Sequence, residues 1–321
     1  MPYLIGTDEA GYAPRLGPLV ISASVFWVDD RGDGDDLYRR LKHIVCRKPA
    51  RGAVQRRLAI ADSKAIYSTA GGLQWLERGV LAMLSLLGSC PQDWLDIWRI
   101  LDAQSLDRLP AQPWHANCTL TLPVAADADE LERFVSTLRR GMDRAGVRLL
   151  ALASRAIFPA EFNSANDRWG NKSQTLSKHT LALLAEMLGH CTGQSVQVVC
   201  DKHGGRNAYG RLLQEQFPES LVEIYGESTA ESVYRWGSDP ERIDVRFRAG
   251  GESFLPAALA SMTSKYLREL SMRLFNEYWC QRVENLAPTA GYPADAVRFR
   301  DAVRDTQQAL GIADHVMWRS R

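Results

Sequence analysis

The chain has 321 residues, of which 45% are hydrophobic and 24% are charged, and its net charge at pH 7 is +1. These values are ordinary for a soluble globular protein. The near-zero charge provides no overall attraction to nucleic acid, so a partner of that kind would need a local basic surface. No apolar run approaches the roughly 20 residues of a membrane-spanning helix. Six scattered cysteines without a CxxC pair indicate neither a disulfide framework nor a zinc site, and reduced thiols fit a cytoplasmic protein.

The first part of the chain is predicted to form two strands joined by an acidic turn. Residues 3–6 are apolar and lead into Asp8 and Glu9, and residues 19–28 form a second apolar run. Too few residues separate the runs for a crossover helix, so the two strands are expected to pair antiparallel. Two carboxylates at the end of a buried strand are costly without a cation, for which Mg²⁺ is the obvious candidate. A surface turn with two solvated acids is the alternative.

The rest of the chain alternates between helical and strand patterns. Helices are predicted over 73–88, 127–145, 173–189, 208–216, 255–280 and 294–310, and strands over 119–124, 147–158, 195–200, 220–225 and 243–248. The basic stretch 37–57 is either a solvated face or an edge that contacts phosphates. The tryptophans at 94, 98 and 114 are assigned to packing. Strands that precede helices throughout predict an α/β fold with a mixed sheet.

Acidic residues stand at three points where an apolar strand ends or a helix begins. These are Asp8 with Glu9, Asp201 after the strand 195–200, and Glu252 before the helix 255–280. Four converging carboxylates would repel one another unless cations lay among them. Such a group can hold two divalent ions ~3.5–4 Å apart, which suits hydrolysis of a phosphodiester. Spacing alone does not establish the convergence, and Asp201 by itself is also a candidate helix N-cap.

Several ordered segments resemble the motifs of ribonuclease HII. Asp8-Glu-Ala-Gly-Tyr-Ala-Pro14 and Leu16-Gly-Pro-Leu-Val20 are similar to that family's DEAGRGP signature with the GP and apolar strand after it. In chain order, the other similar segments are Asp62-Ser-Lys64 (DSK), Glu161-Phe-Asn163, Val198-Val-Cys-Asp201 (a strand ending in a catalytic Asp), Glu252 to Lys265 with Leu267-Arg-Glu269 (AASILAK and RD), and Gly291-Tyr-Pro293 (GYP). The resemblance covers 1–28, 58–68 and 158–300.

The resemblance implies a ribonuclease H-like mixed β-sheet flanked by helices. Residues 1–74 and 151–290 would form the catalytic core. Residues 75–150 have no counterpart in the family and are expected to be an inserted α/β segment or an enlarged subdomain. Residues 291–321 would form a C-terminal helical extension.

The resemblance also implies the residues of the site. Asp8, Glu9, Asp201 and Glu252 would bind two Mg²⁺ or Mn²⁺ ions and carry catalysis, with Glu227 or Glu231 as alternatives for a fourth position that is normally Asp. The expected substrate contacts are Gly11, Tyr12, Ala13, Lys64, His203, Arg206, Lys265 and Arg268. For several of them other roles stay open: Lys64 as a surface lysine, Lys265 and Arg268 in structural ion pairs, and His203 in ordering its loop.

The expected reaction is endonucleolytic hydrolysis of the RNA strand of RNA–DNA hybrids, which leaves a 3′-hydroxyl. In the family, the loop that matches Gly11-Tyr12-Ala13 is GRG and reads the 2′-hydroxyl at the RNA–DNA junction, so the substitution bears on substrate choice. Two alternatives are therefore kept. One is the same fold acting on a different nucleic acid or nucleotide, and the other is a non-catalytic nucleic-acid-binding module.

Overall fold

The computed structural model describes residues 2–29, 36–49, 56–69, 71–116 and 118–320. The strands are β1 (Tyr3–Ala10), β2 (Leu19–Val28), β3 (Val45–Cys46), β4 (Leu58–Ala59), β5 (Val147–Ile157), β6 (Val196–Asp201), β7 (Glu223–Glu227), β8 (Glu231–Trp236) and β9 (Ile243–Arg248). The helices are α1 (Leu37–Arg40), α2 (Ser63–Tyr67), α3 (Gly72–Leu86), α4 (Trp94–Leu101), α5 (Ala128–Ala145), α6 (Pro159–Trp169), α7 (Lys172–Leu188), α8 (Gly210–Gln216), α9 (Leu255–Cys280), α10 (Pro293–Ala309) and α11 (Asp314–Met317), with short 3₁₀ turns at Ala103–Ser105, Leu109–Ala111 and Gly251–Ser253 (η3).

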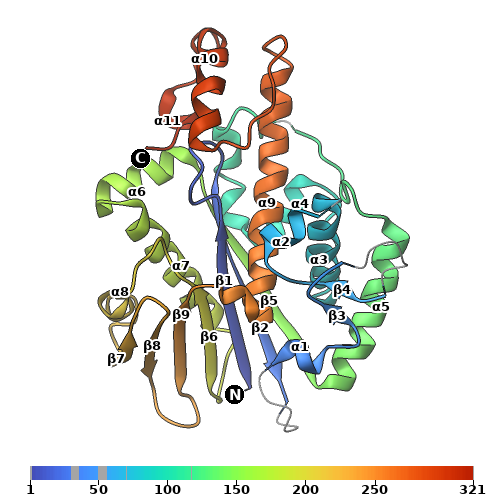
Figure 1. The fold of residues 1–321 in the computed structure, drawn as a ribbon, viewed down its shortest axis with the longest axis vertical. Coiled ribbons are helices and arrows are strands. Elements are labelled where there is room, and N and C mark those ends of the chain that lie inside the picture. Colours follow the sequence, from blue (N-terminus) through green and yellow to red (C-terminus); the bar gives the residue numbers. More distant parts are fainter. Residues whose placement is uncertain (1, 30–35, 50–55, 70, 117, 321) are drawn as a thin grey trace.

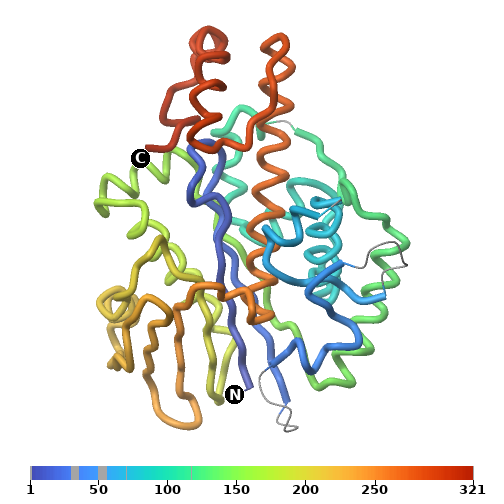
Figure 2. The backbone as a smooth tube through the Cα atoms, in the orientation of Figure 1, coloured from blue at the N-terminus to red at the C-terminus, as the bar shows by residue number. Residues whose placement is uncertain are grey.

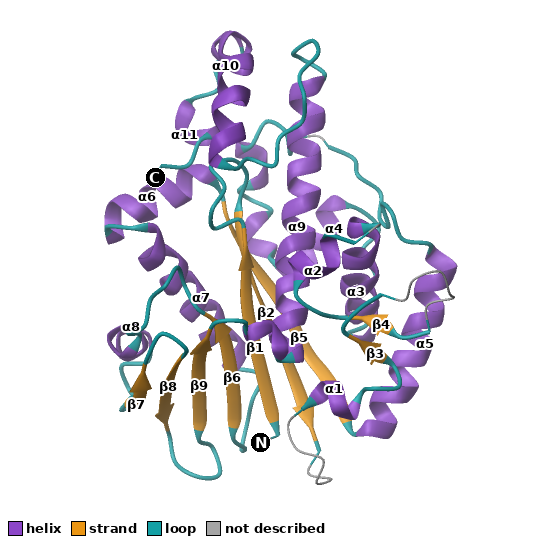
Figure 3. Ribbon diagram, viewed as in Figure 1, coloured by secondary structure: helices purple, strands orange, loops and turns teal. Residues whose placement is uncertain are grey.

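The centre of the molecule is a seven-stranded mixed sheet in the order β5-β2-β1-β6-β9-β8-β7 (Figure 3). The apolar runs 3–6 and 19–28 pair antiparallel as predicted, with Tyr3 opposite Trp27 and Ala10 opposite Val20. Strand β6 lies parallel to β1 on its other side, and β9 lies parallel to β6. Helices cover both faces of the sheet, so the predicted α/β fold, with a mixed sheet flanked by helices, is confirmed.

Alternation along β1 and β2 divides the core between the two faces of the sheet, because successive side chains of a strand point to opposite sides. Leu4, Val20 and Phe26 lie in a cluster with α3, α4, α5 and α9, whereas Ile5 and Ile21 lie in a second cluster with α7 and α8. Each face therefore has its own apolar layer, and β1 is buried between them (Figure 1).

Helix α9 lies directly on β1 at a point where only glycine fits. A Cβ added to Gly6 would be 2.0 Å from the backbone nitrogen of Ala257 and 2.2 Å from the carbonyl carbon of Pro256. The small residues near the start of α9, among them Ala257 and Ala258, permit this approach. The contact fixes the start of α9, and η3 before it, against the strand that carries Asp8 and Glu9.

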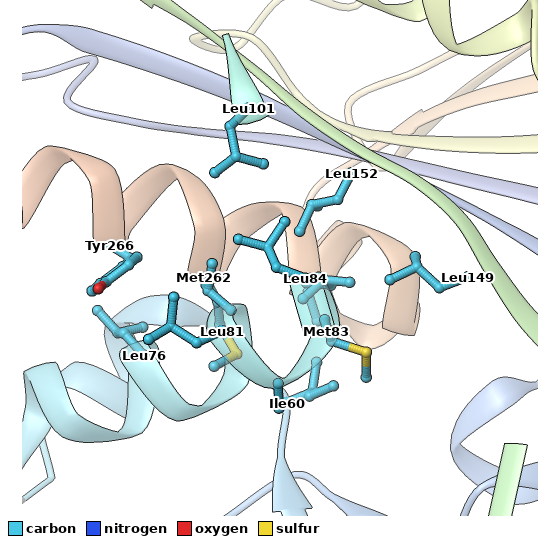
Figure 4. Packing of buried hydrophobic residues seen from close by; sticks show 14 of the residues in the cluster. Ile60, Leu76, Leu81, Met83, Leu84, Leu101, Leu149, Leu152, Met262 and Tyr266 are labelled. Carbon is cyan, nitrogen blue, oxygen red and sulfur yellow. The ribbon is translucent and has the colours of Figure 1, made fainter. Parts of the chain in front are cut away.

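Residues 75–150 pack into the same body as the rest of the chain. Leu76, Leu81 and Leu84 of α3 lie against Met262 and Tyr266 of α9, as Figure 4 shows from close by. The buried carboxylate of Glu77 accepts hydrogen bonds from the backbone N–H groups of residues 124–126 and from the Tyr266 hydroxyl. This segment thus extends the α9 face of the core.

Two predictions of secondary structure were wrong. Residues 119–124 form no strand beyond a single bridge between Asp93 and Thr121, because the amides of 124–126 bind Glu77 and Pro123 has no N–H to donate. Residues 231–236, for which no strand was predicted, form β8, in which Ser232, Tyr234 and Trp236 are buried alternately.

The assignment of the three tryptophans to packing is confirmed. The tryptophans at 94, 98 and 114 are buried, and the six cysteines are free thiols. In the part of the chain that the structure describes, no helix combines the length and apolar character needed to cross a bilayer.

Candidate active site

The four predicted carboxylates come from three neighbouring elements. Asp8 and Glu9 lie at the end of β1, and Asp201 is the last residue of β6. The parallel register pairs Thr7 with Cys200, so the next pair in this register is Asp8 and Asp201. Glu252 lies on η3, and the N–H of Gly251 in the same turn donates to Oδ1 of Asp201 at 3.3 Å. The fold therefore brings together residues that are more than 190 positions apart in sequence.

Burial and mutual repulsion raise the pKa values of these acids. Burial is the largest cause for each of them, and it is followed for Asp8 by the charges of Glu9, Asp201 and Glu252, which together hold the pKa of Asp8 well above its usual range. Burial and then Asp201 raise the pKa of Glu9 to about 8. Burial also raises the pKa of Asp201. The four side chains therefore share one electrostatic environment.

Glu252 has a further acidic neighbour that the site prediction did not include. Burial raises the pKa of Glu252 to about 7, and a hydrogen bond with Asp62 and the charge of Asp201 also raise it. Asp62 begins α2 as its N-cap, where its carboxylate accepts the N–H of Ala65 at 2.7 Å. The proximity of Asp62 to Glu252 joins parts of the chain that are 190 residues apart and has no local signal in the sequence.

Serine hydroxyls hold the Asp8 segment from the side of α9. Ser264 donates to the backbone carbonyl of Asp8 at 3.0 Å, and its hydroxyl oxygen lies 2.8 Å from the hydroxyl of Ser22. A hydrogen bond from Ser261 lowers the pKa of Asp8, against the larger effect of burial. The hydroxyl oxygen of Ser261 also lies within hydrogen-bonding distance of the hydroxyl of Ser63, at 3.0 Å. These serines link α9, α2 and β1 immediately behind the carboxylates.

Lys64 is the cation that faces the carboxylates. Its side chain lies on α2, and the charges of Asp62, Asp8, Glu252 and Asp201 raise its pKa although burial opposes the rise. In turn, Lys64 lowers the pKa values of Glu9 and Asp201. The placement agrees with the predicted position of Lys64 beside the site.

The Gly11-Tyr12-Ala13 loop borders the carboxylates. Tyr12 is half-buried, and its pKa is raised by burial and by the charge of Glu9, whereas a hydrogen bond with Ser173 and the charge of Arg206 lower it. The Lys172 ammonium stands 4.8 Å from the centre of the Tyr12 ring. Ala13 is exposed. Lys172 and Ser173, in the first turn of α7, were not among the predicted contacts, because nothing in the local sequence connects them with Tyr12.

Three of the predicted substrate-contacting residues bind other residues of the protein instead. His203 is 1% exposed, its Nδ1 lies 2.9 Å from the Ser177 hydroxyl, and burial lowers its pKa to about 3. Arg268 is 3% exposed and donates to the carbonyls of Leu16 and Ala290, both at 3.1 Å. Lys265 pairs with Glu269 at 2.5 Å, within α9. We correct the interpretation of His203 and Arg268, because both are buried. His203 orders its loop, which is the other role that the sequence left open, whereas Arg268 binds the carbonyls of Leu16 and Ala290 rather than forming the ion pair kept as its alternative.

The comparisons with known proteins concern the fold. No family model matches the chain, and no curated protein does. Among solved structures, the chain is similar to ribonuclease H2 from Pyrococcus horikoshii OT3, with a TM-score of 0.43 and 12% identity over 98% of this chain and 92% of that one. It is also similar to the ribonuclease HII of Archaeoglobus fulgidus in a structure with PCNA (TM-score 0.42, 12% identity, 99% and 94% covered). A third similar structure is Bst-RNase HIII in complex with Mn²⁺ (TM-score 0.38, 12% identity, 99% and 65% covered).

Proposed function

We propose that this chain is a divalent-metal-dependent endonuclease of the ribonuclease H type, which hydrolyses the RNA strand of RNA–DNA hybrids. The observation that supports this most strongly is the group of four carboxylates at the ends of β1 and β6 and on η3, each with a raised pKa. Structural acids are ordinarily paired with a cation or with several hydrogen bonds, whereas Asp8, Glu9 and Glu252 each have other carboxylates among the charges that raise their pKa values. Strongly perturbed carboxylates of this kind mark functional sites.

The chemistry of the donor set fits hard divalent cations such as Mg²⁺ or Mn²⁺. Asp8, Glu9, Asp201 and Glu252 offer only carboxylate oxygens, which are the ligands that such ions prefer. Among the described residues, no group of three or more His, Cys, Asp or Glu side chains is arranged to hold an ion without rearrangement. Binding would therefore require the side chains to turn toward a common point, and the attraction of each carboxylate to the cation would offset the repulsion among them. Two such ions would activate water and stabilise the leaving oxygen of a phosphodiester.

The remaining residues of the site have separable roles in this proposal. Lys64 would bind a substrate phosphate, because its charge faces the carboxylates from exposed α2. Ser264 would fix Asp8 through its backbone carbonyl, and the Gly251 N–H would orient Asp201. Tyr12, which lies near Glu9, would contact a sugar of the bound substrate. A contact of this kind to the 2′-hydroxyl would let the protein distinguish RNA from DNA. The free cysteines fit action in the cytoplasm.

Cleavage of a labelled RNA–DNA hybrid in the presence of Mg²⁺ or Mn²⁺ tests the proposal. We expect wild-type protein to produce fragments with a 3′-hydroxyl, and Asp8→Asn and Asp201→Asn to lose at least about 10²-fold in rate, the scale of removing a group that stabilises the transition state. Asp305→Asn, an exposed acid on α10, serves as the matched control and should keep full activity. Equal residual cleavage by wild type and both site variants would show that the activity comes from elsewhere.

The substrate is the part of the proposal on which Tyr12 bears most directly. Cleavage rates should be compared for an RNA–DNA hybrid, duplex DNA, duplex RNA, single strands and a duplex with one ribonucleotide. This comparison shows whether the site prefers the hybrid or another nucleic acid. Preference for a substrate without RNA would replace the hybrid in this proposal while keeping the carboxylates. Salt-sensitive binding without turnover of any member would instead indicate a non-catalytic binding module.

A further inference from the structure

The backbone of the loop that carries Tyr12 is held from behind by residues far along the chain. The N–H of Arg15 donates to the carbonyl of Gly291 at 2.7 Å. The carbonyl of Arg15 accepts from the N–H of Arg319 at 2.9 Å, and Leu16 forms an antiparallel bridge with Trp318. Figure 2 shows this part of the N-terminal region beside the last described residues. The loop after β1 is therefore hydrogen-bonded along its backbone to the segment 318–320, which we call the strap.

The side chain of Arg319 reaches the first residue of the same loop. Its Nη2 donates to the carbonyl of Gly11, and its guanidinium lies 4.8 Å from the centre of the Phe162 ring. Arg319 is 4% exposed, and in the described part of the chain its Nε and Nη1 have no hydrogen-bond partner. Burial lowers its pKa to about 9, and the nearby charge of Arg268 adds to this. A buried arginine bound mainly to one backbone carbonyl is costly for stability alone, so its place calls for a functional explanation.

The strap is itself fixed on both sides of Arg319. The amide of Asn163, on α6, donates to the carbonyl of Trp318 at 2.8 Å, and its oxygen accepts the N–H of Ser320 at 2.6 Å. This double contact presents Arg319 to the loop in one orientation. The position of Gly11 thus depends on α6 and on the strap as well as on β1.

Gly11 is enclosed between this contact and a second arginine. Its φ of +89° favours glycine, and a Cβ there would lie 2.6 Å from Nε of Arg268 and 2.6 Å from the carbonyl oxygen of Pro18. Arg268 in turn donates to Leu16, at the other end of the loop. The two arginines therefore fix Gly11 and Leu16, and Tyr12 extends from between these points toward Glu9 and Ser173.

We propose that Arg319 is a positioning residue for substrate selection: it holds the Gly11 end of the loop so that Tyr12 stands beside the carboxylates. The effect on substrate selection rests on the proposed nuclease function, whereas the positioning of Tyr12 by Arg319 does not depend on catalysis. The carboxylates lie on β1, β6 and η3, whose mutual contacts do not involve the strap. Loss of Arg319 therefore acts on the choice of substrate more than on the chemical step.

Amide hydrogen exchange tests the positioning without any substrate. In Arg319→Met, which keeps the length of the side chain but removes its donors, we expect exchange at Arg15 and its loop neighbours to rise about tenfold, the effect of losing one hydrogen bond to a charged group. Arg319→Lys keeps a donor and should restore much of the protection. Arg304→Met, on exposed α10, is the control. Unchanged exchange in the loop of Arg319→Met, with a cooperative melting transition like that of wild type, would refute the inference.

Cleavage then tests the consequence for selectivity. The measured quantity is the ratio of kcat/KM for a continuous hybrid to kcat/KM for a duplex with one ribonucleotide. We expect Arg319→Met to change this ratio at least about fivefold, chiefly through KM, while kcat on the preferred substrate changes less. A purely structural role would lower both values together and leave the ratio unchanged, which would overturn the proposal. If wild type cleaves neither substrate, the proposed function fails, and hydrogen exchange still decides whether Arg319 positions the loop.

Discussion

Replacing Glu9 by glutamine should stabilise the metal-free protein at pH 8. Glutamine keeps the shape of the side chain but removes a negative charge that destabilises the folded state, since burial and Asp201 raise the pKa of Glu9 from 4.5 to about 8. At about 1.36 kcal/mol per pH unit, a shift of this size corresponds to at most about 5 kcal/mol. Glu9 is partly exposed, and solvent screening reduces the expected gain to about 2 kcal/mol.

The sign of the pH dependence follows from proton binding. Between pH 4.5 and 8 the folded state holds the Glu9 proton more tightly than the unfolded state does, so unfolding releases a proton. The free energy of unfolding should therefore be greatest below about pH 4.5 as far as Glu9 is concerned, and this contribution is lost as the pH rises toward 8. The variant lacks this contribution, so the two proteins should differ most at pH 8 and converge toward pH 5.

Urea unfolding at pH 5, 6.5 and 8 with a chelator present measures this difference. Added Mg²⁺ should stabilise wild type at pH 8 by mass action, by about 2.7 kcal/mol at a concentration 100 times its Kd, and Glu9→Gln by less. If the unfolding free energies of the two proteins change in parallel with pH, Glu9 does not carry the strained charge that we assign to it.

Three further predictions concern the frame of the site and are measured against matched variants. Gly6→Ala should cost about 3 kcal/mol in urea unfolding, because the added Cβ would meet rigid backbone 2.0 Å away, whereas Gly226→Ala, which meets nothing, should stay within about 0.5 kcal/mol; equal costs would contradict the close contact. Glu77→Ala should cost about 3 kcal/mol, because it leaves three backbone amides and a tyrosine hydroxyl without an acceptor, and exposed Glu132→Ala should cost little; similar losses would refute this role. Lys64→Met should raise the pKa values of the carboxyls that it faces, followed by NMR titration without metal, and unchanged titrations would place the lysine away from the site.

Much of the fold could be predicted because its signals are local. The run 19–28 and the helix 255–280 have the predicted bounds, since a continuous apolar run and a long helical period need no knowledge of distant residues. The strand prediction over 119–124 was wrong although the apolar residues do alternate, because the buried carboxylate of Glu77 on α3 accepts the amides of residues 124–126. The strand β8 was missed because it begins with Glu231 and Ser232, although Ser232 is buried.

In the candidate site, too, the residues with a local sequence signal could be predicted and the long-range contacts between them could not. The acids at 8, 9, 201 and 252 stand at the ends of strands or the starts of helices, but their position alone did not establish that they converge, and the resemblance of the surrounding motifs singled them out. The contacts that hold them, such as Asp62 beside Glu252 and the strap behind Gly11, join residues up to about 300 positions apart and leave no periodic pattern. His203 was interpreted from its glycine-rich neighbours, but its own burial is set by Ser177 and Tyr209.

The central claim is that four carboxylates from β1, β6 and η3 form one metal centre, and a crystal structure with Mn²⁺ tests it most directly. The account predicts anomalous density for two ions within about 2.0–2.6 Å of carboxylate oxygens, the range for hard divalent cations. Asp8 should lie between the ions, with Glu9, Asp201 and Glu252 completing their ligands. Manganese bound elsewhere, or Glu252 far beyond ligand reach of an ion held by Asp8, would contradict the account.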